Sequence, residues 1–354
     1  MDTQVLFEAD KDGYYNCRIP GIVVTASGVI LAYCESRQGN GGDWDPIDIR
    51  LRRSLDGGET WEPACIIVDH LQYSQTVNNV VMIADQQSGR VVVLFCVEYA
   101  RAYRMYSDDD GATFSEPEEI THAFDRIRDT YPFDVLAIGP GHGIQLRSGR
   151  MVAPIWVSPS HSHRPNRCGT IFSDDEGKTW QAGELLPETF PNCNESTVVE
   201  MADGRVMINC RNQDIANVVP DPNDLYRVTS ISRDGARDWS EPKRDRNLPD
   251  AICFGSLCRY DDNTILFSNA TNQHCTGMWH PDRTHLTVRV SQNDGKTWIA
   301  SRLIGDEKTI MGYSDLAVRE GSILLLHELA EDSSKPWQDS LYLTRFSLDW
   351  LLNA

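Results

Sequence analysis

Arginine side chains occur within, at the end of or just before apolar runs of this sequence. Arg18 lies in "YYNCRIPG", Arg211 in "MINCRNQ" and Arg283 in "HPDRTHLTVR". An arginine inside an apolar strand needs a partner, because the burial of an unpaired charge is costly. Guanidinium groups are permanently charged and donate hydrogen bonds in a planar fork, so they suit a carboxylate better than lysines do. These arginines are therefore candidates for binding an anionic ligand.

Acidic and phenolic side chains occur at similar positions, near the ends of apolar runs. Carboxylates can act as general acids or bases. A tyrosine, with an unperturbed pKa near ~10, becomes a nucleophile only with a base within hydrogen-bond reach. The candidates are Glu35, Asp43 and Asp45 in "ESRQGNGGDWDP", which also contains Arg37, Glu195 in "CNESTVV", Tyr313 in "MGYSDLAV" and Glu328 in "LLLHELAE".

The net charge of the chain is −19, which argues against nucleic acid as a partner, because binding of a phosphate backbone requires a basic face. An anionic ligand would need a local arginine cluster to overcome this field. No apolar run approaches the ~20 residues of a membrane span. The N-terminal "MDTQVLFEADKDG" lacks the features of a signal peptide.

The ten cysteines lie mostly in apolar, strand-like runs, which is typical of buried reduced thiols. We therefore expect a cytoplasmic protein that binds no membrane, unless a signal peptide has been removed. The histidines in "SHSHRPN" and "NQHCTGMWHPDRTH" fit no standard set of metal ligands. We expect neither a metal nor a cofactor.

Five related octapeptides recur along the chain about 50 to 65 residues apart, a spacing typical of propellers and arrays. The fourth copy has Ala236 where the others carry glycine, and the fifth has Asn293 in place of aspartate. The copies are "SLDGGETW" at 54–61, "SDDDGATF" at 107–114, "SDDEGKTW" at 173–180, "SRDGARDW" at 232–239 and "SQNDGKTW" at 291–298.

A second repeated pattern alternates with the first, namely a turn followed by an apolar run, as in "SGRVVVLFC" and "DGRVMINCR". It occurs six times, and helical periodicity is nearly absent. Six similar all-β units without a linker predict one domain over residues 1–354, a six-bladed β-propeller. Radial repetition of this kind leaves few exposed sheet edges.

The octapeptides themselves are expected to be structural. Serine and aspartate can bond the backbone of the turn, glycine supplies a positive φ, and the aromatic residue packs beneath. A calcium loop would require more oxygen ligands at fixed offsets. Asp56 is therefore interpreted as a turn residue, and the chemistry is expected among the polar residues of the inner strands.

Taken together, "RIPG" with Arg18, the Glu195 and Arg211 pair, "HPDRTHLTVR" and "GYSDL" resemble the exo-sialidase (neuraminidase) family of glycoside hydrolases, and the octapeptides match its Asp-box. The resemblance covers essentially the whole chain in order. It implies that a sialylated glycan is the substrate. The oligomeric state does not follow from it.

The resemblance also implies roles for individual residues. Arg18, Arg211 and Arg283 would grip the substrate carboxylate, and Tyr313 would be the nucleophile with Glu195 as its partner. Sialic acid carries its carboxylate on the anomeric carbon, so a neutral phenol avoids the repulsion that a carboxylate nucleophile would meet. Tyrosine is the known nucleophile of sialidases. The remaining roles are Asp43 as acid/base, Glu328 as the group that orients Arg18, Arg37 as a contact to the sugar 4-position and Asn79 as a further substrate contact.

Some assignments have rivals within the sequence. Arg289 competes with Arg283, although its place in "LTVRVS" indicates a structural role, and Asp45 lies two residues from Asp43. His142, Trp156 and Trp279 are candidates for the leaving-group side of the site. The same catalytic residues would serve a hydrolase of a deaminated sialic acid (Kdn), a trans-sialidase or an intramolecular cyclising enzyme. A propeller that binds a glycan or protein without catalysis would have no reason to combine Tyr313, Glu195 and Asp43.

Overall fold

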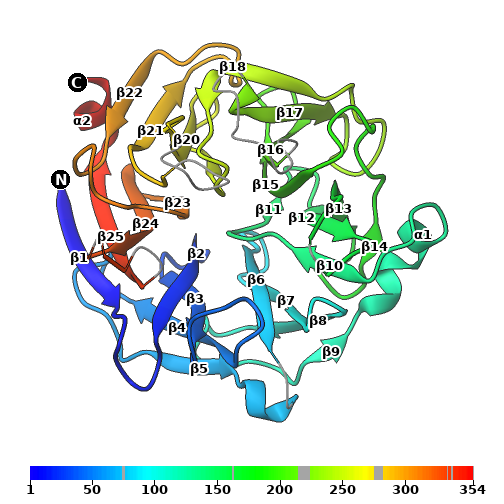
Figure 1. Ribbon diagram of the computed structural model, residues 1–354, viewed down its shortest axis with the longest axis horizontal. Coiled ribbons are helices and arrows are strands. Elements are labelled where there is room, and N and C mark those ends of the chain that lie inside the picture. The colour runs from blue at the N-terminus through cyan, green and yellow to red at the C-terminus, as the bar shows by residue number, and fades with distance from the viewer. Residues whose placement is uncertain are drawn as a thin grey trace.

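The structure of the chain is a computed structural model that describes all residues except 74–75, 162, 214–223, 275–281, 333, 336–337 and 354. Six antiparallel sheets surround a common axis in the described residues, five with four strands and one with five (Figure 1). The prediction of an all-β, six-bladed propeller is confirmed. No described helix is both long and apolar enough to cross a membrane.

The first three blades follow one another along the chain, each running from an inner strand to an outer one (Figure 1). Blade 1 contains β2 (Asn16–Val24), β3 (Ile30–Arg37), β4 (Ile47–Ser54) and β5 (Cys65–Val68). Blade 2 contains β6 (Val77–Ala84), β7 (Val91–Val97), β8 (Arg101–Ser107) and β9 (Glu118–Glu119). Blade 3 contains β10 (Val135–Ile138), β11 (Ile144–Gln145), β12 (Met151–Ser158), β13 (Arg167–Ser173) and β14 (Gln181–Ala182).

The last blade closes the ring with the N-terminal strand, because β1 (Asp2–Phe7) pairs with β25 (Asp339–Ser347). Blade 6 also contains β23 (Ser314–Arg319) and β24 (Ser322–Ala330).

Blades 4 and 5 lie between blade 3 and blade 6 along the chain. Blade 4 contains β15 (Cys193–Glu200), β16 (Val206–Asn212), β17 (Tyr226–Ser232) and β18 (Lys243–Pro249). Blade 5 contains β19 (Ser256–Arg259), β20 (Ile265–Ala270), β21 (Leu286–Ser291) and β22 (Ala300–Leu303).

Short helical segments lie outside the sheets. Two of them, η2 (Thr121–Phe124) and α1 (Asp125–Arg128), lie on the outer side of blades 2 and 3 (Figure 1). The others are η1 (His70–Gln72) and the C-terminal α2 (Leu348–Leu352), which begins after Ser347, whose hydroxyl accepts the N–H of Trp350.

The hydrophobic core is divided among the interfaces between neighbouring blades. Leu31 and Tyr33 of β3, for example, pack in one cluster with Val93 and Phe95 of β7. Both faces of a middle strand are therefore covered, which explains why runs such as "VVVLFCV" are apolar without alternation. The described cysteines are free thiols, and most of them are buried in these interfaces.

The octapeptides form hydrogen-bonded turns between the third and fourth strands. The Ser54 hydroxyl accepts from the N–H of Gly58 at 2.7 Å and donates to Asp56 Oδ1 at 2.9 Å. The Asp56 carboxylate accepts from the N–H and hydroxyl of Thr60 at 2.9 and 2.6 Å. Asp56 is thus a turn residue.

The fourth octapeptide differs from the alignment by one position. The N–H of Gly235 donates to the Ser232 hydroxyl at 3.1 Å, and Gly235 has a φ of 73°. Its glycine therefore follows the serine by three residues rather than four. Ala236 is not the counterpart of the glycine in the other copies.

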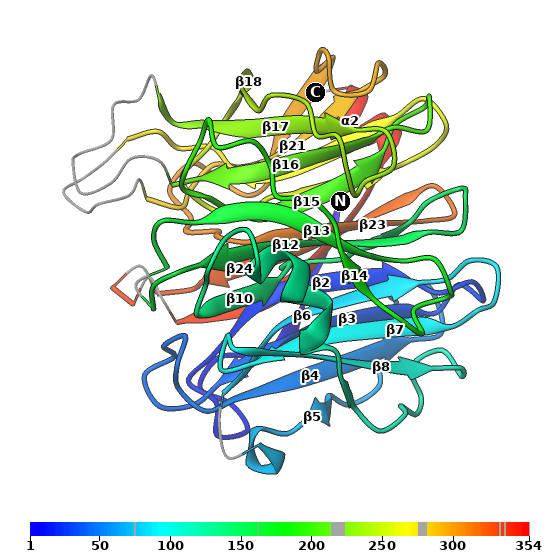
Figure 2. The same ribbon diagram turned by 90° about the vertical axis from the view of Figure 1, so that its right-hand side faces the viewer.

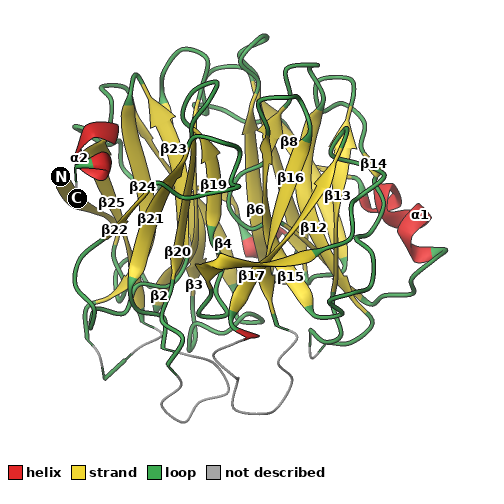
Figure 3. Cartoon of the chain, turned by 90° about the horizontal axis from the view of Figure 1, so that it is seen from above, coloured by secondary structure: helices red, strands yellow, loops and turns green. Residues whose placement is uncertain are grey.

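Strand direction separates the octapeptides from the predicted site residues. Neighbouring strands are antiparallel, so the start of the first strand, the end of the second and the start of the third lie at one face of a blade. The octapeptides follow the third strands and lie at the opposite face. Figures 2 and 3 show the strands running between these two loop-bearing faces.

Candidate active site

The predicted site residues lie at the face opposite the octapeptides, where inner strands begin and second strands end. They come from five of the six blades. Arg18 lies in β2, Asn79 in β6, Glu195 in β15 and Tyr313 directly before β23, while Arg37 ends β3, Arg211 lies near the end of β16, Glu328 lies near the end of β24, Asp43 follows β3 and Arg283 precedes β21.

Tyr313 lies at the centre of this group. Its buried phenol donates a hydrogen bond to Glu195 Oε1 and accepts one from Arg211 Nη1 at 2.8 Å. Arg211 Nη1 also donates to Glu195 Oε2 at 2.6 Å. Burial raises the pKa of Tyr313 well above its usual value, with Glu195 adding to this rise and Arg211 and Arg283 opposing it. The phenol is therefore protonated, and its proton points at Glu195.

The structure brings the three predicted arginines together around Tyr313. The Cζ atoms of Arg18 and Arg283 lie 5.3 and 5.1 Å from the centroid of the tyrosine ring, and Arg211 contacts its hydroxyl. All three arginines are buried. Such a concentration of positive charge is what a bound anion would require in a chain of net charge −19.

Glu328 holds Arg18 in place. Its carboxylate accepts from Arg18 Nε at 3.1 Å and Nη2 at 3.3 Å, and from the N–H groups of Ile19 and Tyr313 at 3.2 and 2.8 Å. Burial would raise the pKa of Glu328, but Arg18 and these N–H donors bring it below its usual value. An ionised Glu328 thus fixes Arg18 relative to the segment that carries Tyr313.

Arg37 links Asp43 to a second buried carboxylate, Glu35. Its Nε and Nη2 donate to Glu35 Oε2 at 3.0 and 2.6 Å, and its Nη1 donates to Asp43 Oδ1 at 2.6 Å. The Asp43 side chain is half exposed. Burial of its surroundings would raise the pKa of Asp43, but the guanidinium groups of Arg37 and Arg18 lower it to about 2. Asp43 is therefore ionised and paired in this state.

Asn79 contacts this network through its backbone. Its N–H donates to Glu35 Oε1 at 2.7 Å, and its φ is 53°. The register of β6 shifts between Asn78 and Val81, as that of β2 shifts next to Arg18. Bulges of this kind re-aim side chains beside functional sites. The Asn79 side chain is buried, and its Nδ2 has no hydrogen-bond partner among the described residues.

Two residues of the site were not recognised from the sequence. Asp339, at the start of β25, places Oδ2 3.2 Å from Arg18 Nε and is buried. Gln213 lies against Arg211, and in the amide orientation that satisfies both groups its oxygen accepts from Nη2 at 2.6 Å. Asp339 opens an apolar run, "DSLYLTRF", and this position is the signal that could have identified it.

The rivals of the predicted residues have structural contacts. Arg289 donates to Asn269 Oδ1 at 3.1 Å within blade 5, and its burial lowers the pKa of the guanidinium to about 10. Asp45 accepts from the N–H groups of Asn40 and Gly42 at 2.9 Å and so shapes the loop that carries Asp43.

His142 lies against Asp315 of the inner strand β23. Its Nδ1 is 2.8 Å from Asp315 Oδ1, which also accepts from the Ser256 hydroxyl at 2.7 Å, while Asp315 Oδ2 accepts from the N–H of Ile22 at 2.9 Å. Burial lowers the pKa of His142, but the Asp315 carboxylate outweighs it and the pKa is raised. Asp315 thus joins blades 1, 5 and 6 and the segment after β10.

Aromatic side chains gather beside Asp43. The ring of Trp44, which is half exposed, lies 5.0 Å from that of Tyr99, and the ring of Trp156 lies 5.0 Å from that of His163. Tyr99 and His163 are 4.9 Å apart, so the four rings form one cluster. Trp156 thus lies on this side of the site, whereas Trp279 falls outside the described residues.

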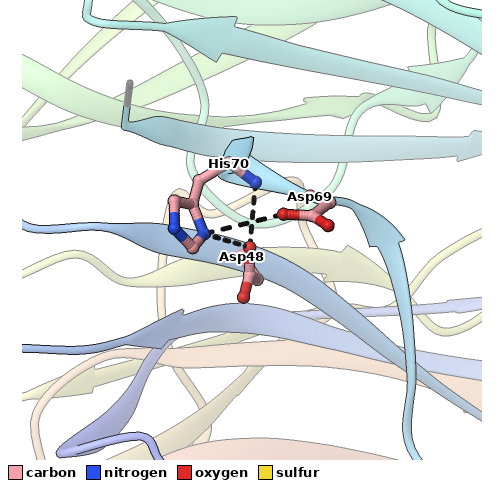
Figure 4. Close-up of side chains that lie close together, drawn as sticks. All are labelled: Asp48, Asp69 and His70. Carbon is pink, nitrogen blue, oxygen red and sulfur yellow. Dashed lines mark hydrogen bonds and ion pairs between the residues drawn. The ribbon is translucent and has the colours of Figure 1, made fainter. Parts of the chain in front are cut away.

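Three side chains that could ligate a metal, those of Asp48, Asp69 and His70, lie close together where η1 meets β4 (Figure 4). His70 Nδ1 is 2.7 Å from Asp48 Oδ1 and 3.7 Å from Asp69 Oδ1. Asp48 already accepts from the Tyr14 hydroxyl at 2.6 Å and from the N–H of His70 at 2.9 Å. These contacts satisfy Asp48 without an ion, and we interpret the group as a hydrogen-bond network that holds η1 against β4.

The family model for the BNR repeat-like domain matches residues 22–326. The chain therefore belongs to this family of repeat-built propellers. This membership, together with the relatives described next, confirms the resemblance to sialidases with Asp-box repeats.

Curated relatives of the chain include sialidases from Micromonospora viridifaciens and Bacteroides fragilis, each 27% identical over 90% of this chain. A sialidase from Paraclostridium sordellii is 28% identical over 88% of this chain and 81% of its own length. The chain spans 50% and 61% of the length of the first two relatives.

Solved structures of similar shape include a Hadza microbial sialidase, with a TM-score of 0.82 and 24% identity over 99% of this chain and 69% of that one. The intramolecular trans-sialidase of Ruminococcus gnavus, solved with oseltamivir carboxylate, gives a TM-score of 0.75 and 16% identity over 99% of this chain and 98% of that one. At these identities the similarity supports the fold alone.

Proposed function

We propose that this chain is an exo-α-sialidase that releases terminal α-linked sialic acids from oligosaccharides or glycoconjugates, with retention at the anomeric carbon. The observation that carries the proposal is the Tyr313 phenol, hydrogen-bonded to Glu195 and Arg211 and surrounded by three arginines. The curated relatives named sialidases support the same class of activity. We also propose that residues 1–354 are sufficient for catalysis.

The arginines account for recognition of the substrate. Sialic acid carries its carboxylate on the anomeric carbon, and guanidinium forks bind a planar carboxylate with paired, charge-assisted hydrogen bonds. Binding by Arg18, Arg211 and Arg283 would place the anomeric carbon above Tyr313. A neutral phenol can approach this carbon without the like-charge repulsion that an aspartate or glutamate nucleophile would meet.

In the first step, the Tyr313 oxygen bonds to the anomeric carbon as the glycosidic C–O bond breaks. The phenolic proton passes to Glu195 along the existing hydrogen bond, and Asp43 protonates the departing oxygen. In the second step, Asp43 takes a proton from water, the water oxygen bonds to the anomeric carbon, and Tyr313 leaves and recovers its proton from Glu195. Two displacements give net retention.

Asp43 must change partners before it can act as the acid. Paired with Arg37, its pKa of about 2 keeps it ionised. In the proposed complex Arg37 turns its donors to the sugar 4-position, which removes this stabilisation of the carboxylate. The pKa of Asp43 then rises, and Asp43 can carry a proton to the leaving group.

The proposal is tested by incubating the purified chain with 4-methylumbelliferyl α-sialoside and with its deaminated analogue, and separating the products by chromatography. Release of free sialic acid, seen first as the α-anomer by NMR, is the expected result. A transferred or anhydro product would show that the enzyme transfers or cyclises its substrate instead of hydrolysing it. A preference for the analogue would show that the deaminated sugar is the better substrate. Binding without turnover of either compound would contradict an enzymatic role.

A further inference from the structure

Arg18 lies between two buried carboxylates, and the second of them, Asp339, has no part in the steps above. We propose that Asp339 is a positioning residue that controls how strongly Arg18 binds the substrate carboxylate: when uncharged it leaves the guanidinium to the substrate, and when charged it competes for it. The inference rests on the proposed function, because it concerns an anionic substrate.

The contacts of Arg18 show which of its donors a ligand can use. Glu328 takes the edge formed by Nε and Nη2, at 3.1 and 3.3 Å, and Asp339 Oδ2 lies 3.2 Å from the same Nε. Nη1 has no hydrogen-bond acceptor within the part of the chain that the structure describes. A substrate carboxylate would therefore approach Nη1, on a guanidinium that already faces two acidic side chains.

The two carboxylates are not equivalent. Glu328 accepts four hydrogen bonds, two from Arg18 and two from backbone N–H groups. The Asp339 carboxylate accepts no hydrogen bond from the described residues, and its ion pair is with Arg18. When two buried acids share one cation, the acid with fewer donors is the one that keeps a proton.

The charges around Asp339 agree with this asymmetry. Arg18 faces it from β2, Arg37 from the end of β3, Arg283 from the segment before β21 and Glu328 from the neighbouring β24. Burial and the Glu328 charge raise the pKa of Asp339 to about 7, against the opposing effect of the three arginines. Asp339 therefore changes its charge near neutral pH.

Substrate binding should be linked to this titration. A bound carboxylate beside Arg18 adds a negative charge near Asp339, so it raises the pKa of Asp339 further and draws a proton from solution. Affinity should consequently fall as the pH rises through about 7. A rise of one pKa unit on binding corresponds to a change in affinity of up to about tenfold.

The experiment is isothermal titration calorimetry with the unsaturated sialic acid analogue 2-deoxy-2,3-didehydro-N-acetylneuraminic acid at pH 5.5, 7 and 8.5. Each titration is run in two buffers of different ionisation enthalpy, which reports proton uptake. The wild type should lose about tenfold in affinity between pH 5.5 and 8.5 and take up part of a proton near pH 7, at most about half for a pKa rise of one unit. Asp339→Asn should lose the fall in affinity as the pH rises through about 7 and should take up less of a proton than the wild type, because only the uptake by Asp43 in the proposed complex remains.

Asp85→Asn is the matched control. Asp85 is also buried, but it follows β6 at the octapeptide face and accepts from the N–H groups of Gln87 and Ser88. This variant should retain the pH dependence of the wild type. An unchanged pH dependence in Asp339→Asn would overturn the inference.

Two further outcomes are decisive. If Asp339→Asn does not fold, His142→Gln is measured instead, because His142 is a largely buried imidazole whose pKa is raised by the Asp315 carboxylate. Proton uptake that persists in His142→Gln supports Asp339, and uptake that disappears overturns the inference. A wild type that binds the analogue at no pH would instead refute the proposed function itself.

Discussion

The Tyr313 hydroxyl donates a hydrogen bond to the Glu195 carboxylate, although 118 positions of sequence separate the two residues. Tyr313 precedes the inner strand of blade 6, and Glu195 lies in the inner strand of blade 4. The closed ring of blades therefore brings Tyr313 and Glu195 together. A phenol whose proton already points at a carboxylate needs only the loss of that proton to become a nucleophile.

Arg211→Lys should lower kcat/KM by about ten- to a hundredfold, although the charge is conserved. Arg211 Nη1 contacts both Glu195 and Tyr313, and loss of charge-assisted hydrogen bonds costs about 1.5–3 kcal/mol. Steady-state kinetics on an aryl sialoside would measure the effect. Near-normal kinetics would mean that the guanidinium geometry of Arg211 is not used.

Ser54→Ala should reduce stability by about 1 kcal/mol without changing turnover per folded molecule. The buried Ser54 hydroxyl accepts from the N–H of Gly58 and donates to Asp56, at the face opposite the site. Asp56→Ala should lower the melting temperature in the same way. Thermal unfolding and active-site-normalised kinetics test both variants, and a loss of kcat at unchanged stability would place the octapeptide in the chemistry.

The repeats allowed the architecture to be predicted, because every blade repeats its apolar runs and turn residues locally. Closure of the ring by β1 was not predicted. Pairing of Gln4 with Leu343 joins opposite ends of the chain. A strand as short as Asp2–Phe7 has no sequence pattern that indicates which strand it pairs with. The one-residue contraction at Gly235 was also missed, because an ungapped alignment placed Ala236 in the glycine position.

The site was predictable only where a residue lies in a recognisable motif. Arg18, Glu195 and Tyr313 could be identified in this way, and the structure brings them together. The pairing of Asp43 with Arg37 and the position of Asp339 depend on contacts between separate elements. Neither composition nor periodicity contains such contacts, so these features required the structure.

Asp43→Asn should reduce kcat/KM by about a hundred- to ten-thousandfold on sialyllactose, whose leaving group needs a proton, and much less on an aryl sialoside with an acidic phenol. Asp45→Asn is the matched control, since Asp45 shapes the same loop through Asn40 and Gly42. Any loss in that variant should be equal for both substrates. Equal losses in Asp43→Asn would argue against Asp43 as the general acid.

His327 should make the protein sensitive to acid. Its imidazole is buried between the backbone oxygen of Glu328 and the Thr344 hydroxyl, and burial lowers its pKa to about 4. The unfolded chain, with a histidine pKa near ~6.5, binds more protons between these values. The contribution of His327, up to about 3 kcal/mol, is therefore complete above pH 6.5 and lost as the pH falls towards 4.

Urea unfolding at pH 7, 5.5 and 4.5 would measure this loss. His327→Gln retains one donor and one acceptor but does not titrate, so its free energy of unfolding should fall less over the same range. An identical decline in both proteins would assign the acid sensitivity to other groups.

Tyr313→Phe removes only the oxygen that would attack the sugar. The arginines and Glu328 do not depend on that oxygen for their mutual contacts, so the variant should still bind the unsaturated sialic acid analogue. Its kcat should fall by several orders of magnitude, as expected when covalent catalysis is lost. Titration calorimetry and single-turnover kinetics on the same preparation separate binding from chemistry.

The most direct measurement of the central claim is peptide mass spectrometry after treatment with 2,3-difluorosialic acid, whose second fluorine slows breakdown of a glycosyl–enzyme adduct. We predict that the fluorinated sugar is attached to the peptide containing Tyr313, and that Tyr313→Phe carries no label. A label on Asp43 or Glu195, or labelling of the phenylalanine variant, would contradict Tyr313 as the nucleophile.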